Sequence, residues 1–238
     1  MRYIDEAVMD RLDGAAFQAQ EPYPWVNPPG FLTADGYGRL VDTLPAPELF
    51  DRRFGEKRKH GQQSHDRLTL DYRPDLALAE PWRAFIGEIN APTYRRFVER
   101  MFGRRALRFV LHWHYTPNGC SVSPHCDSRR KLGSHIFYFN TAKDWRVEWG
   151  GETLILDDKG RFKADSAPGF EDFDRVLPAT AMGNYSMLFM RRKRSWHGVK
   201  EIRCPPDALR KVFIVVIEDW SLPARVKSLV RGGKPNRY

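Results

Sequence analysis

Three residues of the sequence have the types that can bind one metal ion together: His125, Asp127 and His197. His125 and Asp127 are separated by one residue, so in a strand both side chains point to the same side and can reach one ion. Two imidazoles and one carboxylate on one face of a metal leave adjacent coordination positions open, which suits the chemistry of non-haem Fe(II) with oxygen. The sequence therefore predicts a facial Fe(II) site made of these residues.

The His-x-Asp spacing needs support from its surroundings, because it arises readily by chance in a chain of this composition. The alternative is a surface histidine beside an aspartate that caps a turn. A second pair, His112 and His114, has the same spacing but no carboxylate nearby in the chain. We therefore rank this second pair below the first as a ligand set.

The elements that must position these residues change in kind near residue 105. Before it, apolar spacing predicts helices over 33–44 and 80–102, the second interrupted at Pro92, and alternation predicts a strand over 65–72. After it, short apolar segments separated by turn residues predict strands, and the polar stretch 159–183 predicts a loop with some local structure. The predicted strands cover 107–116, 134–140, 152–156, 186–190 and 210–219. Helices followed by many short strands favour an α+β unit with a helical layer supporting a sandwich or barrel.

The bulk composition predicts a globular chain, with 42% hydrophobic and 29% charged residues in 238. We expect one domain over 1–221 and a peripheral basic tail over 222–238. No apolar run is long enough for a membrane span, and the N-terminus lacks the apolar segment of a secretory signal. The odd set of cysteines, Cys120, Cys126 and Cys204, argues against a disulfide framework and favours a cytoplasmic setting.

The net charge of +9 is concentrated in two segments. Five basic residues and no acid follow Asp219, and the stretch 52–59 holds five basic residues against one glutamate, so the rest of the chain is formally neutral. Such segments are typically solvated, and the alternative is that the tail docks an acidic partner. This distribution disfavours a nucleic-acid partner.

Between residues 107 and 218 the chain resembles the Fe(II)/2-oxoglutarate dioxygenases, in their prolyl-hydroxylase-like branch. The likeness lies in the order and spacing of short motifs. These are Tyr115 ten residues before His125, the His125-Cys126-Asp127 motif, the Ile136–Asn140 strand followed by Asp144-Trp145, Gly150-Gly151, the Asn184–Phe189 strand, Trp196-His197-Gly198, and the Leu209–Ile214 strand. The resemblance implies a double-stranded β-helix, a jelly-roll-like barrel over 105–221, supported by mainly helical residues 1–104.

The resemblance also implies a cosubstrate site beside the iron. Fe(II), 2-oxoglutarate and O2 are the expected cofactors, with ascorbate as a candidate reductant. Arg210 is expected to bind the far carboxylate of 2-oxoglutarate, because a guanidinium forms two parallel hydrogen bonds with such a group. Tyr138 and Tyr115 are the expected further contacts. Lys131 and Trp196 are weaker candidates for substrate contact, against a solvated lysine and a packed tryptophan.

Strand alternation separates some of these candidates. Arg210 follows His197 at a longer interval than in the relatives, which leaves Lys211 and Arg203 as rivals; we favour Arg210, on one face with Val212, Ile214 and Val216. If Tyr115 faces the iron, then His112 and His114 face away from it.

The expected activity is hydroxylation of an aliphatic C–H bond, with release of succinate and CO2. The resemblance favours a prolyl or amino-acid substrate, in a peptide or free, and admits a small metabolite. Two alternatives remain: an oxidative demethylase of nucleic acids, and a non-catalytic barrel that binds metal or a partner.

Overall fold

The structure of the protein is a computed structural model that describes residues 1–222 and 224. The α-helices of this part are α1 (Glu6–Arg11), α2 (Gly14–Ala19), α3 (Ala34–Asp42), α4 (Glu80–Asn90) and α5 (Pro92–Phe102). The strands are β1 (Trp25–Val26), β2 (Asp51–Arg53), β3 (Arg67–Asp71), β4 (Leu107–Pro117), β5 (Val122–His125), β6 (Lys131–Tyr138), β7 (Thr153–Asp157), β8 (Arg175–Ala179), β9 (Ser186–Met190), β10 (Trp196–Val199) and β11 (Leu209–Asp219). Short 3-10 helices cover Pro47–Leu49, Lys59–Gly61, Val147–Trp149 and Phe170–Asp172.

The predicted helices are confirmed, and their ends follow from local chemistry. The Thr33 side chain accepts a hydrogen bond from the Gly36 amide and so caps α3. The predicted break at Pro92 separates α4 from α5, because proline has no N–H to continue the helical ladder. Helix α5 ends at Gly103, whose left-handed backbone (φ +60°) favours glycine.

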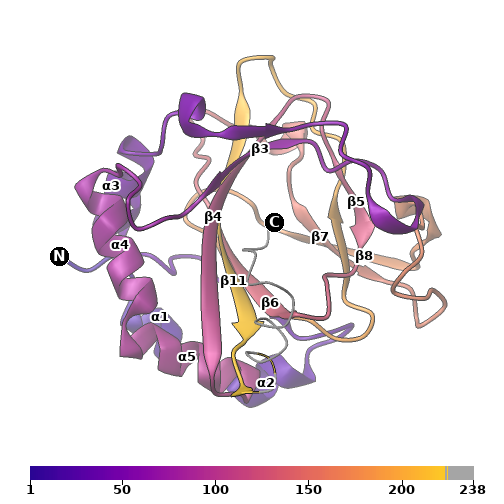
Figure 1. The fold of residues 1–238 in the computed structure, drawn as a ribbon, viewed down its shortest axis with the longest axis horizontal. Coiled ribbons are helices and arrows are strands. Elements are labelled where there is room, and N and C mark those ends of the chain that lie inside the picture. The colour runs from indigo at the N-terminus through magenta and orange to yellow at the C-terminus, as the bar shows by residue number, and fades with distance from the viewer. Residues whose placement is uncertain (223, 225–238) are drawn as a thin grey trace.

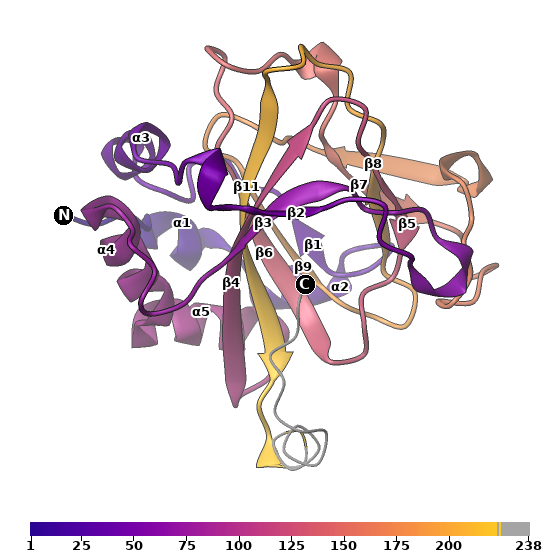
Figure 2. The same ribbon diagram turned by 45° about the horizontal axis from the view of Figure 1, so that its top comes forward.

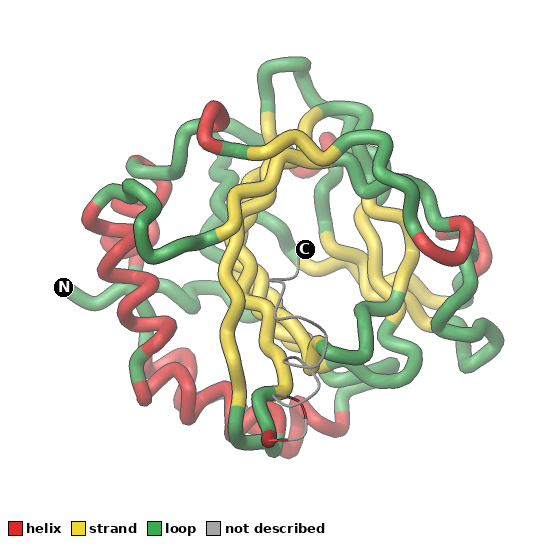
Figure 3. Tube along the Cα trace, viewed as in Figure 1, coloured by secondary structure: helices red, strands yellow, loops and turns green. Residues whose placement is uncertain are grey.

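The strands form two antiparallel sheets, as shown by secondary structure in Figure 3. The larger sheet has the order β1-β9-β6-β11-β4-β3-β2, and the smaller one the order β5-β10-β7-β8. The helices cover the outer face of the larger sheet, and the smaller sheet lies on its other side (Figure 1). The predicted jelly-roll-like architecture is confirmed, with the two sheets facing each other but not closed into a continuous barrel.

The two faces of the central strand β11 pack against different layers. Phe213, Val215 and Ile217 pack with the helices, and aromatic residues of α4 such as Phe85 lie against Phe213 (ring centroids 5.6 Å apart). The alternate residues Val212 and Ile214 join a second cluster with Tyr138 between the sheets. This strand is apolar on both faces, so its hydrophobicity alone does not say which face looks toward the smaller sheet.

The predicted strand over 65–72 is confirmed as β3, which together with β1 and β2 extends the larger sheet at both of its edges. One expectation about organisation needs correction. The stretch 159–183, expected as a loop, includes β8, which pairs with β7. Apart from Leu222 and Ala224, the predicted basic tail lies outside the described residues, and so does its expected docking to an acidic partner.

The segment between β2 and β3 reaches toward β5 of the smaller sheet in both orientations of the molecule (Figures 1 and 2). His65, at the end of this segment, contacts Ser123 of β5 through its Nε2 atom, 3.0 Å from the serine Oγ. The segment therefore connects an edge of the larger sheet with the strand that ends at His125. None of the described helices is long and apolar enough to cross a membrane.

A buried histidine on the helix-facing side makes the stability sensitive to acid. His135 is 0% exposed and contacts the Tyr94 hydroxyl through Nδ1 at 2.9 Å, and burial lowers its pKa to about 3. In the unfolded chain its pKa returns to about 6.5, so the unfolded state binds the proton first and stability falls as the pH drops from 6.5 toward 3.

We expect His135→Gln to reduce the loss of unfolding free energy between pH 7 and pH 5 by about 2 kcal/mol. Urea denaturation at both pH values measures this, with exposed His60→Gln as the control. If wild type and His135→Gln lose equal unfolding free energy between pH 7 and pH 5, His135 is not the source of the acid sensitivity.

Candidate metal centre

The three predicted ligands come together on the smaller sheet. Strands β5 and β10 are antiparallel neighbours, and His125 lies directly opposite His197 in their register. The two imidazole centroids are 4.3 Å apart, and Asp127 follows just after β5 ends. One ligand atom from each residue lies within 4.8 Å of the other two, and all three residues are buried. This is the facial arrangement that the His-x-Asp spacing predicted.

Both histidines are held in the tautomer that a metal requires. The Nδ1 atom of His125 lies 3.0 Å from the Ser123 carbonyl oxygen, and that of His197 lies 3.0 Å from the Ser195 carbonyl oxygen. A carbonyl only accepts, so each Nδ1 carries the proton and donates it. The lone pair of each Nε2 is then available for a metal, and the backbone fixes the orientation of the ring.

The charges around Asp127 favour its ionised form. Burial acts to raise its pKa, but Lys131, His197 and His125 together outweigh burial and hold the pKa below its ordinary value. The Lys131 Nζ lies 2.9 Å from Asp127 Oδ1. Burial also lowers the pKa of His125 and of His197. All three residues are therefore in their metal-binding protonation states at neutral pH.

Lys131 thus pairs with a predicted metal ligand, whereas the sequence suggested substrate contact or a solvated loop. We expect Lys131→Met to weaken Fe(II) binding about 10- to 100-fold, the usual cost of losing an outer partner of a ligand. Anaerobic Fe(II) titration against a competing chelator measures the affinity. Arg130→Met is the matched control, because Arg130 is half exposed and its nearest acid is Glu218, 4.0 Å away. Equal affinities of the Lys131 and Arg130 variants would exclude this role.

Alternation along β10 places the neighbours of His197 on opposite sides. The His197 ring faces Phe189 of the larger sheet, with centroids 4.8 Å apart, and so points between the sheets. Trp196 points to the outer side, where it packs against Phe162 and Phe173. The suggested substrate contact of Trp196 is therefore wrong, and packing is its role in this structure.

Arg210 points into the space between the sheets and is buried. Its Nε donates to the Gly151 carbonyl oxygen at 2.5 Å, and one terminal nitrogen donates to Thr153 Oγ1 at 3.3 Å. The Tyr138 hydroxyl donates to the same threonine oxygen at 2.9 Å, and the Arg210 guanidinium lies over the Tyr138 ring. Arg210 forms no ion pair with any carboxylate of the described residues.

The Gly150-Gly151 motif is explained by this packing. Gly151 has a φ of +95°, which L side chains rarely adopt, and an added Cβ would lie 3.0 Å from Cδ of Arg210. Glycine here lets the arginine lie against the backbone that accepts its hydrogen bond.

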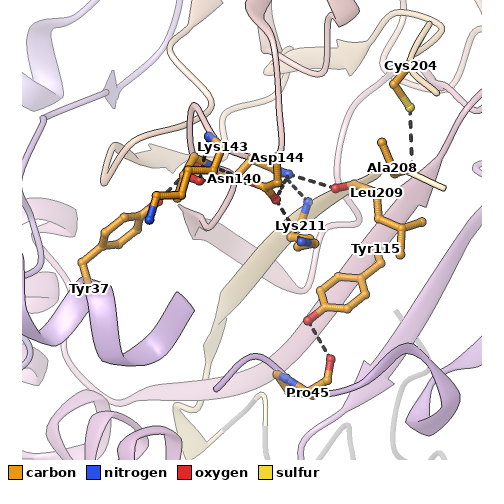
Figure 4. A network of polar contacts seen from close by, with 11 residues as sticks. Tyr37, Pro45, Tyr115, Asn140, Lys143, Asp144, Cys204, Ala208, Leu209 and Lys211 are labelled. Carbon is orange, nitrogen blue, oxygen red and sulfur yellow. Dashed lines mark hydrogen bonds and ion pairs between the residues drawn. The ribbon is translucent and has the colours of Figure 1, made fainter. Parts of the chain in front are cut away.

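The two rivals of Arg210 lie elsewhere. Lys211 is on the helix-facing side of β11, where its Nζ pairs with Asp144 at 2.9 Å and its amide donates to Asn140 (Figure 4). Arg203 is exposed and pairs with Glu201 at 3.5 Å. The strand alternation that favoured Arg210 for the inward position is thus confirmed by the structure.

The prediction that Tyr115 faces the iron is wrong. Its register partner on β11 is Lys211, so both side chains lie on the helix-facing side. There Tyr115 stacks on Phe50 at 4.2 Å and donates its hydroxyl hydrogen to the Pro45 carbonyl oxygen (Figure 4). The inward residues of this strand are instead His112, His114 and Thr116, the reverse of the expected parity.

Two further residues near the metal ligands were missed from the sequence. The His65 ring lies 4.7 Å from the His125 ring, and Arg67 of β3 donates to His114 Nε2 at 3.3 Å. Alternation along the predicted strand 65–72 could have placed Arg67. Leu68 and Leu70 pack on the helix-facing side of β3, so the alternate residues Arg67 and Thr69 face the space between the sheets.

Comparisons with known proteins now add to this geometry. No protein-family model matches the chain. The curated proteins contain no match either. Solved structures do match. A prolyl hydroxylase from Trichoplax adhaerens, in complex with a hypoxia-inducible-factor oxygen degradation domain peptide, superposes with a TM-score of 0.64 at 14% identity and covers 94% of this chain and 93% of its own. A Pseudomonas putida prolyl-4-hydroxylase gives 0.58 at 16% identity, covering 86% and 97%.

A third structure is an oxidoreductase of the 2OG-Fe(II) oxygenase family from Burkholderia pseudomallei, with a TM-score of 0.56, 15% identity and coverage of 90% and 91%. At these identities the likeness concerns the fold. The chain thus has the double-stranded β-helix fold of 2-oxoglutarate and Fe(II) oxygenases, prolyl hydroxylases among them, as the sequence resemblance implied.

Proposed function

We propose that this protein is an Fe(II)- and 2-oxoglutarate-dependent dioxygenase that hydroxylates an aliphatic C–H bond. The observation that carries the proposal is the combination of a buried His-Asp-His triad with a buried arginine that has no carboxylate partner among the described residues. Burying a guanidinium without an anion is costly, so a ligand that brings its own carboxylate fits there.

The residues present fit both groups. His125, Asp127 and His197 would hold Fe(II) through two Nε2 atoms and one carboxylate oxygen, a donor set suited to this ion. Arg210 would bind the far carboxylate of 2-oxoglutarate, and Tyr138, linked to Arg210 through Thr153, would be its second donor. When bound, Fe(II) would couple O2 reduction and decarboxylation of 2-oxoglutarate to oxidation of the substrate, with succinate and CO2 as products.

The chain's own contribution is to orient and to exclude water. The two serine carbonyls and Lys131 orient the ligands, and the Gly151 carbonyl and Thr153 orient Arg210. Phe189 and Met187 contribute apolar surface next to His197 and Tyr138. Oxygen chemistry requires such a shaped and dry environment.

An anaerobic titration tests this proposal. Addition of Fe(II) and 2-oxoglutarate should produce a weak visible absorption band, and admission of O2 should then yield succinate. If neither the band nor succinate forms, the oxygenase proposal fails and the alternative of a non-catalytic barrel is favoured. The other alternative, a nucleic-acid demethylase, predicts succinate release stimulated by methylated oligonucleotides rather than by amino acids, peptides or small metabolites.

A further inference from the structure

Besides Arg210, the space between the sheets contains a second arginine without a carboxylate partner. Arg67 of β3 donates Nε–H to His114 Nε2 at 3.3 Å and a terminal N–H to the His65 carbonyl oxygen at 2.7 Å. It is partly buried, and it forms no ion pair with a carboxylate of the described residues. The other terminal nitrogen of its guanidinium therefore has donors to spare.

Two further donors lie next to Arg67 on the same inward face. Thr69 lies directly opposite His114 in the register of β3 and β4. Its side chain is only 2% exposed, and its buried Oγ1 has no hydrogen-bond partner among the described residues. His114 accepts from Arg67 at Nε2, so its Nδ1 carries the proton, and no described residue accepts it. A buried hydroxyl is rarely left without a partner, so an unpaired one points to an absent acceptor.

Arg67, Thr69 and His114 form a corner of the space between the sheets, and the guanidinium of Arg67 gives this corner a positive charge. Burial and then the positive charge of Arg58 lower the pKa of the Arg67 guanidinium, while the more distant acids Glu56 and Asp71 act in the opposite direction. Burial, followed by Arg67 and other cations, lowers the pKa of His114, which keeps this ring neutral. The corner thus combines one guanidinium, one neutral imidazole N–H and one hydroxyl, all donors and none compensated by an acid at contact distance.

This corner is connected to the metal ligands through His65 and lies on β3 and β4, whereas the expected 2-oxoglutarate anchor lies on β11. The His65 carbonyl accepts from Arg67, and the His65 ring lies 4.7 Å from the His125 ring and contacts Ser123 of β5. Arg210 is on β11, where it pairs with Thr116 of the intervening strand β4. A ligand held by Arg67 would therefore bind on a different strand from 2-oxoglutarate at Arg210.

We propose that Arg67, Thr69 and His114 bind the carboxylate of the primary substrate, so that the substrate is a small carboxylic acid, such as a free amino acid, rather than an internal residue of a peptide. A carboxylate has the planar shape that one guanidinium binds through two N–H groups, and its second oxygen can accept from a hydroxyl and an imidazole. The proposal rests on the proposed oxygenase function for the term substrate, whereas the anion site itself does not require a metal.

The test uses acetate as the probe and metal-free, 15N-labelled protein. The Arg67 Nε–H resonance is assigned by its absence in Arg67→Lys, and the Thr69 amide provides a second signal that survives this substitution. Acetate should shift both resonances saturably, and neutral acetamide should not. In Arg67→Lys the affinity read from Thr69 should fall at least about tenfold, because the forked contact is lost.

Two matched variants locate the site. Arg39→Met, on helix α3 outside the sheets and already paired with Glu80, should leave the acetate affinity unchanged. Arg210→Met should lower it far less than Arg67→Lys does. The proposal is overturned if wild type shows no saturable shift, if acetamide acts like acetate, or if Arg210→Met and not Arg67→Lys abolishes the shift. Because this readout needs no iron, failure of the oxygenase proposal would appear separately, in the anaerobic titration.

Discussion

Replacement of His197 by alanine is expected to abolish Fe(II) binding and with it the formation of succinate. His197 supplies one of three ligands, and its ring is fixed by the Ser195 carbonyl and by packing on Phe189. Loss of an outer partner of a ligand already costs about 10- to 100-fold in affinity, so loss of the ligand itself should cost more than about 100-fold.

The fold should survive this change, because β10 keeps its backbone pairs with β5 and β7 and the packing of Trp196 against Phe162 and Phe173. Circular dichroism and thermal melting of the metal-free protein check that point. His135→Gln is the matched control, since it removes a buried histidine from the opposite face of the larger sheet. Full Fe(II) affinity in His197→Ala would show that the triad is not the iron site.

Replacement of Arg210 by methionine is expected to raise the dissociation constant of 2-oxoglutarate about 100-fold while Fe(II) affinity is retained. Truncating one partner of a buried charge pair costs about 2–5 kcal/mol, which corresponds to a factor of that order. The methionine side chain fills most of the space that the arginine occupies beside Gly151, but it carries no charge. In the absence of 2-oxoglutarate, the variant should lose at most the free energy of the two hydrogen bonds that Arg210 donates. The wild-type guanidinium is buried without an anion, so no ion pair is lost with it.

The control for this prediction comes from the adjacent residue. Lys211→Met removes a cation that lies on the other face and pairs with Asp144. Its 2-oxoglutarate affinity should equal that of wild type. Thermal shifts measured with increasing 2-oxoglutarate on the Mn(II)-loaded proteins report the affinity without turnover. A larger effect of Lys211→Met than of Arg210→Met would contradict the inward orientation of Arg210.

The sequence predicted those helices and strands whose signals lie within a few residues of the chain. Thr33, Pro92 and Gly103 mark helix ends through a cap, a missing N–H and a positive φ, and none of these depends on distant residues. Strand β8 was missed because it lies in a polar stretch and exists through its pairing with β7, which is a long-range interaction. Strands at the edges of a sheet, such as β1 and β2, have the same origin.

The error at Tyr115 shows what alternation alone cannot decide. Strand β4 carries large side chains on both faces, Trp113 and Tyr115 on one and His112 and His114 on the other, so its pattern defines two faces but not which one is inward. The register decides it. Because Tyr115 pairs with Lys211, an inward Arg210 and an inward Tyr115 exclude each other.

The sequence by itself predicted that His125 and Asp127, two positions apart, could reach one ion, and it predicted helices α3, α4 and α5. It also separated Arg210 from Lys211 onto opposite faces of β11, and the pairing of β5 with β10 brought His197 opposite His125. Tertiary structure decided which residues gather around that triad. The contact of Arg67 with His114 and the position of the His65 ring beside His125 follow from the way β3 and the 54–66 segment pack against β4 and β5, which are far from them in the chain.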